Sequence, residues 1–181
     1  MRHTKPLIGV LGLLACHSLQ AQPPGITMDM INTTLPLEGA PLALAGPYTS
    51  LSEAAHDAPR YVVYRPADLA SFPASDTLPV LVWGNGGCAI DGASYAEFLG
   101  TIASHGFVAL TTTALEGEER RSQDADDLRG ALDWAEQENR RAGSPLEGKI
   151  DTSQMAAMGQ SCGGFLSVEL GTDARVDTIG V

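Results

Sequence analysis

A serine flanked by glycines stands near the end of the chain, where residues 159–163 read Gly-Gln-Ser-Cys-Gly. The preceding stretch, 155–158, is short and apolar like a buried strand, and the stretch that follows is apolar and helix-like. A Gly-x-Ser-x-Gly pattern between a strand and a helix is a nucleophile elbow, a sharp turn that presents a serine hydroxyl. Gly159 and Gly163 suit this turn because side chains there would collide with neighbouring backbone. The pattern therefore predicts that Ser161 is a nucleophile.

A serine hydroxyl attacks a carbonyl only when a base takes its proton and hydrogen-bond donors stabilise the oxyanion. The backbone N–H of Cys162, the residue after the serine, is the usual first donor in such a turn. We expect the second donor in the glycine-rich loop 84–88, which directly follows the apolar stretch 78–83. Asn85 and Gly86 are both candidates, and the sequence does not choose between them.

Strands and helices alternate in the part of the chain that must position these residues. Short apolar or β-branched stretches predict strands, and apolar residues at helical spacing predict helices. The predicted strands are 61–64, 78–83, 107–110, 155–158 and 176–181, and the predicted helices are 94–104, 124–141 and 165–170. This alternation indicates an α/β fold with a mostly parallel sheet and right-handed crossovers.

The first 21 residues have the features of an export signal. Arg2 and Lys5 precede an apolar run, 7–15, that would rise about 14 Å as a helix and is too short to span a bilayer. Two processing routes are open, besides an uncleaved anchor. One is cleavage after Ala21; the other is lipidation of Cys16 in a Leu-Leu-Ala-Cys sequence similar to the lipobox of bacterial lipoproteins. Both predict a secreted or periplasmic protein, lipid-anchored in the second case.

We expect three segments along the chain. A signal peptide, 1–21, is followed by a loop-rich segment, 22–59, in which short apolar pieces such as 42–44 are candidate edge strands. The remaining residues, 60–181, form a partial α/β domain.

The chain is acidic. Without the signal, nine Lys and Arg residues face 22 Asp and Glu residues, a formal charge of −13. Such a surface repels nucleic acid and anionic membranes, so we expect neither as a partner, apart from a lipid anchor at Cys16. The acidic runs 116–119 and 124–127 are interpreted as a solvated loop and a helix start. We expect no metal and no cofactor.

Three stretches together, 78–88, 104–107 and 159–164, resemble the α/β-hydrolase superfamily. The likeness is strongest to exported esterase-like members of the chlorophyllase, dienelactone-hydrolase and polyester-hydrolase-like group, and it covers about 61–181. The resemblance implies a carboxylic ester hydrolase that acts by acyl transfer through Ser161. Its substrate would be a small-molecule or polymeric ester.

In that superfamily an Asp and a His follow the serine in chain order. Beyond the signal, the histidines are His56 and His105, and both precede the serine. Asp173 and Asp177 follow it, but neither comes after a later strand. We therefore expect a C-terminally truncated member, with only the N-terminal part of the fold and without the final strands and helices. Alternatives to an active esterase are an inactive truncated product and a non-catalytic binding module of the same fold.

Two cysteines, Cys88 and Cys162, remain after the signal. An even pair in an oxidising compartment suggests a disulfide, although two small buried thiols are the alternative. If the elbow and loop assignments hold, these cysteines flank the same oxyanion hole. A bridge between them would then fix the spacing of its donors.

Overall fold

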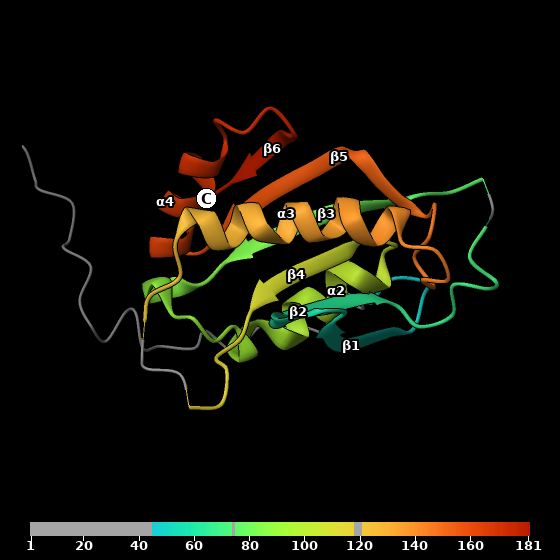
Figure 1. Ribbon diagram of the computed structural model, residues 1–181, viewed down its shortest axis with the longest axis horizontal. Helices are drawn as coiled ribbons and strands as arrows, with labels where there is room; N and C mark the ends of the chain where they lie inside the picture. Colours follow the sequence, from blue (N-terminus) through green and yellow to red (C-terminus); the bar gives the residue numbers. More distant parts are fainter. Residues whose placement is uncertain (1–44, 74, 118–120) are drawn as a thin grey trace, which may run out of the picture. The chain divides into compact units, whose positions relative to one another are not determined.

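The computed structural model describes residues 45–73, 75–117 and 121–181. Within these residues six strands form one sheet, in the order β1-β2-β4-β3-β5-β6 (Figure 1). The strands are β1 (Ser50–Ala55), β2 (Ala58–Pro66), β3 (Leu78–Gly84), β4 (Val108–Thr112), β5 (Ile150–Gly159) and β6 (Val176–Gly180). The last four run parallel, whereas β2 pairs antiparallel with both β1 and β4.

Three α-helices connect the parallel strands, as the alternating pattern predicts. They are α2 (Ala96–Ser104), α3 (Ala125–Arg140) and α4 (Cys162–Leu170). Two short 3-10 turns, η1 (Gly86–Cys88) and η2 (Ala93–Tyr95), follow β3. The mostly parallel sheet with crossover helices confirms the predicted fold class, an α/β fold.

The helices lie on both faces of the sheet (Figure 1). Two clusters of buried apolar side chains form the core. Leu132 of α3 packs in one core with Val80 and Val82 of β3. Leu99 of α2 packs in the other core with Leu81, the residue between those two valines. Successive side chains of a strand point to opposite faces, so β3 is apolar throughout because both of its faces are covered.

Two strands differ from the sequence expectation. The edge strand of the N-terminal segment is β1, at Ser50–Ala55, whereas the candidate 42–44 lies outside the described residues, as does the predicted signal 1–21. β5 begins at Ile150, before the predicted 155–158, because its register against β3 shifts and accommodates the polar residues 152–154. A β-bulge of this kind interrupts the apolar pattern on which strand prediction depends.

Helix α3 begins with a capping box. The Asp124 side chain accepts the N–H of Asp127 at 3.0 Å, and the Asp127 side chain accepts the N–H of Asp124 at 3.0 Å. The Arg121 guanidinium binds both carboxylate oxygens of Asp127, at 2.5 and 2.7 Å. These contacts fix the chain just before α3, next to the carboxyl ends of β3 and β4.

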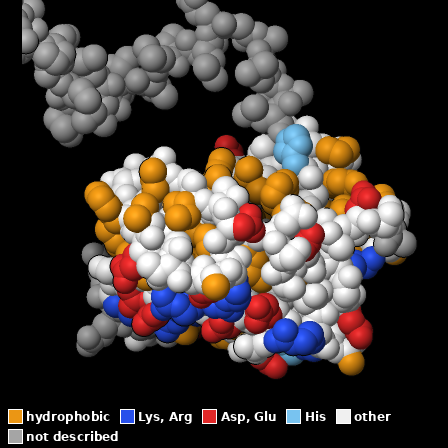
Figure 2. All heavy atoms as spheres, turned by 90° about the horizontal axis from the view of Figure 1, so that it is seen from above, with side chains coloured by type: hydrophobic (Ala, Val, Ile, Leu, Met, Phe, Trp, Pro, Cys, Tyr) orange, Lys and Arg blue, Asp and Glu red, His pale blue; other side chains and the backbone are white. Residues whose placement is uncertain are grey.

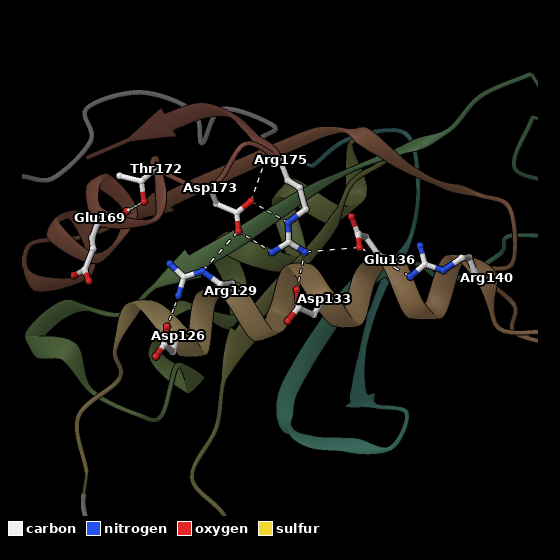
Figure 3. A network of polar contacts seen from close by, with 9 residues as sticks. All are labelled: Asp126, Arg129, Asp133, Glu136, Arg140, Glu169, Thr172, Asp173 and Arg175. Atoms are coloured by element: carbon white, nitrogen blue, oxygen red, sulfur yellow. Dashed lines mark hydrogen bonds and ion pairs between the residues drawn. The ribbon is translucent and has the colours of Figure 1, made fainter.

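A network of ion pairs joins α3 to the turn between α4 and β6 (Figure 3). Arg175, just before β6, binds Asp173 at 2.7 Å and Asp133 of α3 at 2.6 Å. The Nε of Arg129, in α3, lies 3.7 Å from Oδ2 of Asp173, the same oxygen that Arg175 contacts through Nη2. Hydrogen bonds from Arg175 lower the pKa of Asp173 to about 2.

Acid should therefore weaken the attachment of β6. The folded pKa of Asp173 is below its unfolded value, so its stabilising contribution is complete above about pH 5 and disappears as the pH falls through 4 toward 2. After allowance for solvent screening we expect about 1 kcal/mol. Urea unfolding at pH 7 should show Asp173→Asn destabilised by this amount, with a smaller difference at pH 2.5. The control is Asp126→Asn, an exposed member of the network, and an equal Asp173→Asn effect at both pH values would contradict the prediction.

In the parts of the chain that the structure describes, none of the helices has the length and hydropathy needed to cross a bilayer.

Candidate active site

The turn between β5 and α4 places Ser161 at the carboxyl end of a parallel strand. Its backbone has φ 53° and ψ −116°, a combination that non-glycine residues rarely adopt. The turn is closed by the N–H of Gly163, which donates to the Gln160 carbonyl at 3.0 Å, and by the N–H of Gly164, which donates to the Ser161 carbonyl at 2.9 Å. The serine is exposed. Strand, strained serine and helix therefore follow one another as in a nucleophile elbow.

Three glycines allow the first turn of α4 to approach the strands. A Cβ added at Gly159 would collide with the backbone of Gly163. A Cβ added at Gly163 would collide with the carbonyl of Gly84, at the end of β3. A Cβ added at Gly84 would likewise collide with the backbone of Gly163. The helix thus packs backbone to backbone against the ends of β3 and β5, which places the elbow beside the loop that follows β3.

A disulfide joins that loop to the elbow. Cys88 ends η1 and Cys162 begins α4, and their Cα atoms are 5.2 Å apart. The bridge predicted from the sequence is therefore present. The loop bends sharply at this point, because Gly87 has φ 64° and Cys88 has φ 49°.

A buried glutamine, Gln123, anchors the loop from the other side. Its side-chain oxygen accepts the backbone N–H of Asn85 at 2.7 Å. The backbone N–H of Gln123 donates to the Cys88 carbonyl at 2.8 Å. Its side-chain nitrogen donates to the hydroxyl of Thr112, at the end of β4, at 3.0 Å. The Asn85 side chain, also buried, donates to the carbonyl of Ala89 at 2.9 Å. The backbone N–H of Asn85 thus points into the fold, toward a fixed acceptor.

The second loop candidate, Gly86, faces a different partner. Its N–H donates to the hydroxyl of Tyr95 at 2.9 Å, and this hydroxyl lies 3.1 Å from the side-chain oxygen of Gln160 in the elbow. The Tyr95 ring packs against Trp83, with ring centroids 5.2 Å apart. Tyr95 therefore connects the loop after β3 to the residue directly before Ser161.

An apolar hollow of about 320 Å³ opens beside the serine. Phe165 and Val168 of α4 line it together with Val181, and these two helix residues are 79% and 54% exposed. Figure 2 shows hydrophobic side chains gathered over α4 and β6, next to a band of charged side chains of both signs. An apolar group attached to a bound carbonyl would find its contacts here.

The structure does not bring the histidines to Ser161. His56 lies in the turn between β1 and β2, and β1 is four strand spacings from β5, about 19 Å. His105 follows α2 and precedes β4, so it lies at the opposite end of the parallel strands from the elbow. Asp173 is held by Arg175, and the Asp177 side chain accepts the N–H of Met155 at 2.8 Å. These aspartates support β6 and the bulge in β5.

Two residues of this site, Gln123 and Tyr95, are missed by sequence reasoning. Gln123 lies in a polar run, and its position immediately before the helix cap is its only sequence signal. Tyr95 lies at helical spacing from Phe98, Leu99 and Ile102, so in the sequence it is indistinguishable from an ordinary core residue of a helix. Both act through partners far away in the chain.

The sheet, the turn after β5 and the loop after β3 have the arrangement of an α/β-hydrolase. Residues 62–175 match the family model described as PETase, PET hydrolase-like. The chain belongs to this family of α/β-hydrolase polyester hydrolases. The match spans both the loop after β3 and the elbow. A comparison with curated proteins gives no match.

Proposed function

We propose that this protein is an exported serine ester hydrolase that acts by acyl transfer through Ser161. The observation that carries the proposal is the exposed serine at φ 53° between β5 and α4. A backbone of this kind is unfavourable for serine, and such positions concentrate at functional sites. Gly159 and Gly163 support the assignment because they permit the close approach of α4.

The oxyanion would be bound by two backbone N–H groups. Cys162 is the first residue of α4, where amides lack an intrahelical acceptor and the helix dipole favours negative charge. Between the two loop candidates, the contacts favour Gly86. The N–H of Asn85 is held by buried Gln123, whereas that of Gly86 is held by a hydroxyl at the partly exposed edge of the loop.

In this reaction the Ser161 Oγ attacks the ester carbonyl, and its proton passes to solvent water because neither His56 nor His105 is positioned to accept it. The tetrahedral intermediate then expels the alcohol and leaves an acyl-enzyme, which water hydrolyses. The ester would be small or polymeric, with an apolar part against Phe165 and Val168. The disulfide supports an oxidising compartment and thus export through the signal 1–21, by cleavage or with a lipid anchor at Cys16.

A second candidate function is a non-catalytic member of the fold that binds esters without turnover. The observation that favours it is the placement of His56 and His105, neither of which is positioned to accept the Ser161 proton. In a serine hydrolase, removal of the base lowers kcat about 10⁶-fold and leaves roughly 10³- to 10⁴-fold catalysis over water.

A fluorophosphonate probe tests this proposal on the full chain, because the probe labels activated serines. We expect mass spectrometry to find the label on Ser161, formed slowly because neither His56 nor His105 accepts its proton, and no label in Ser161→Ala. Ser153→Ala, in β5, is the control and should label like the unmodified chain. With the two histidines placed as they are, hydrolysis of p-nitrophenyl acetate should exceed the rate in water by no more than about 10⁴-fold. Labelling that persists in Ser161→Ala would contradict the proposed nucleophile, and binding of esters without labelling would favour the second function.

A further inference from the structure

The backbone N–H of Gly86, the proposed second oxyanion donor, already has a hydrogen-bond acceptor within the protein. The Tyr95 hydroxyl lies 2.9 Å from the Gly86 nitrogen and 3.1 Å from the Gln160 side-chain oxygen. An amide oxygen only accepts hydrogen bonds, so the Tyr95 O–H donates to Gln160. Its lone pair therefore faces the N–H of Gly86. Both hydrogen bonds have a defined direction, and the tyrosine oxygen is the acceptor at the loop.

The Tyr95 hydroxyl and the Gln160 side chain lie directly against Gly86. A Cβ added at Gly86 would collide with the Gln160 side-chain oxygen and would come within 2.6 Å of the Tyr95 hydroxyl. The distance from the Gly86 nitrogen to the tyrosine oxygen, 2.9 Å, is within the range of about 2.7 to 3.1 Å that a donor makes to a substrate oxyanion. The phenolic oxygen thus takes the place that a carbonyl oxygen would need.

The Tyr95 hydroxyl can move away from the N–H of Gly86 by rotation of the tyrosine side chain, without a change in the main chain. The backbone of Tyr95 is fixed by its N–H, which donates to the Gly92 carbonyl at 2.9 Å, while its side chain is only half-buried. The ring rests on Trp83 at the edge of the core that contains Leu99. Rotation of the side chain would therefore break its two hydrogen bonds and this peripheral packing, but no main-chain contact. The acceptor on Asn85 has no such freedom, because Gln123 is buried and bound at several atoms.

We propose that Tyr95 is a positioning residue that occupies the oxyanion position on Gly86 in the ligand-free protein and leaves when a carbonyl oxygen binds. The inference rests on the proposed function of Ser161. Tyr95 holds the loop against the elbow through Gln160, so the donor keeps its orientation between ligands. It also competes with the ligand for the same N–H, so its removal should strengthen the binding of an oxyanion.

The test uses 4-fluorophenylboronic acid, followed by ¹⁹F NMR on the full chain. The serine Oγ adds to the empty orbital of boron, its proton passes to solvent, and the tetrahedral anion places an oxygen at the donors. We expect Tyr95→Phe to bind about 2- to 10-fold more tightly than the unmodified chain, the equivalent of one hydrogen bond. Tyr48→Phe, whose ring packs against Phe72, is the matched control and should bind as the unmodified chain does.

The outcomes separate this inference from the proposed function. If Ser161→Ala loses binding but Tyr95→Phe binds equally or more weakly than the unmodified chain, the role of Tyr95 is overturned and that of Ser161 stands. If binding survives in Ser161→Ala, or if no variant binds, the proposed function fails and the inference with it.

A second measurement on the same variants is amide hydrogen exchange by NMR. The N–H of Gly86 should exchange faster in Tyr95→Phe, whereas that of Cys88, which donates to the Asn85 carbonyl, should be unchanged. A merely structural role for Tyr95 would accelerate both. Unchanged exchange at Gly86 would overturn the proposal.

Discussion

Gly163→Ala is expected to lower the free energy of unfolding by about 3 kcal/mol or more. The added methyl group would collide with the carbonyl of Gly84 and approach the backbone nitrogen of Asn85. Both are main-chain atoms of buried structure, so relief requires α4 to move away from the end of β3. Since domains of this size are stable by about 5 to 15 kcal/mol, the loss would be a large fraction of the total.

Urea unfolding followed by circular dichroism measures this effect. The matched control is Gly100→Ala in α2, where the new methyl group would lie 3.6 Å from the Ser50 hydroxyl, an ordinary contact. Alanine favours a helix interior over glycine by about 1 kcal/mol, so the control should be neutral or stabilising. A Gly163→Ala variant as stable as the unmodified protein would show that α4 does not pack backbone to backbone on β3.

Reduction of the Cys88–Cys162 disulfide is expected to lower the free energy of unfolding by about 4 kcal/mol. The two cysteines are 74 residues apart, and a cross-link across so long a segment restricts the unfolded chain strongly. The experiment compares urea unfolding with and without dithiothreitol. The double variant Cys88→Ser, Cys162→Ser is the control, because the reductant should not change its midpoint.

The same experiment has a chemical readout. Alkylation without prior reduction should leave Cys88 and Cys162 unmodified in freshly purified protein, and mass spectrometry would detect any label. Two alkylated thiols, or an unfolding midpoint that the reductant does not change, would argue against a stabilising bridge. The double variant also separates the contribution of the disulfide from that of side-chain packing. Any packing lost with the two cysteines would destabilise the double variant equally with and without dithiothreitol.

The sequence predicts those parts of the fold that depend on neighbouring residues. The strand 78–83 reads as continuously apolar because both faces of β3 are covered, and α3 is recognised from its apolar stripe and its acidic start. The sharp turn between strand and helix is predicted from Gly159 and Gly163, at which a Cβ would collide with neighbouring backbone. The disulfide is predicted because a single pair of cysteines, Cys88 and Cys162, follows the predicted signal 1–21.

The contacts that complete the site are not local and leave little trace in the sequence. Gln123 meets Asn85 across 38 residues, and Tyr95 meets Gln160 across 65 residues. Their side chains acquire a role only when the sheet brings the ends of β3 and β5 together. For the same reason the sequence leaves Asn85 and Gly86 as equal candidates, whereas their different acceptors distinguish them in the structure.

The backbone at Ser161 has a consequence for the balance between stability and reactivity. At φ 53° and ψ −116° a glycine would be comfortable, whereas a Cβ costs about 1 to 3 kcal/mol. A chain optimised for stability alone would carry glycine there, in a run that already holds glycines at positions 159, 163 and 164. On the role that we propose for Ser161, serine at this position lowers the stability of the turn and keeps a hydroxyl clear of the backbone. Substitutions that stabilise this turn should then be those that remove the proposed nucleophile.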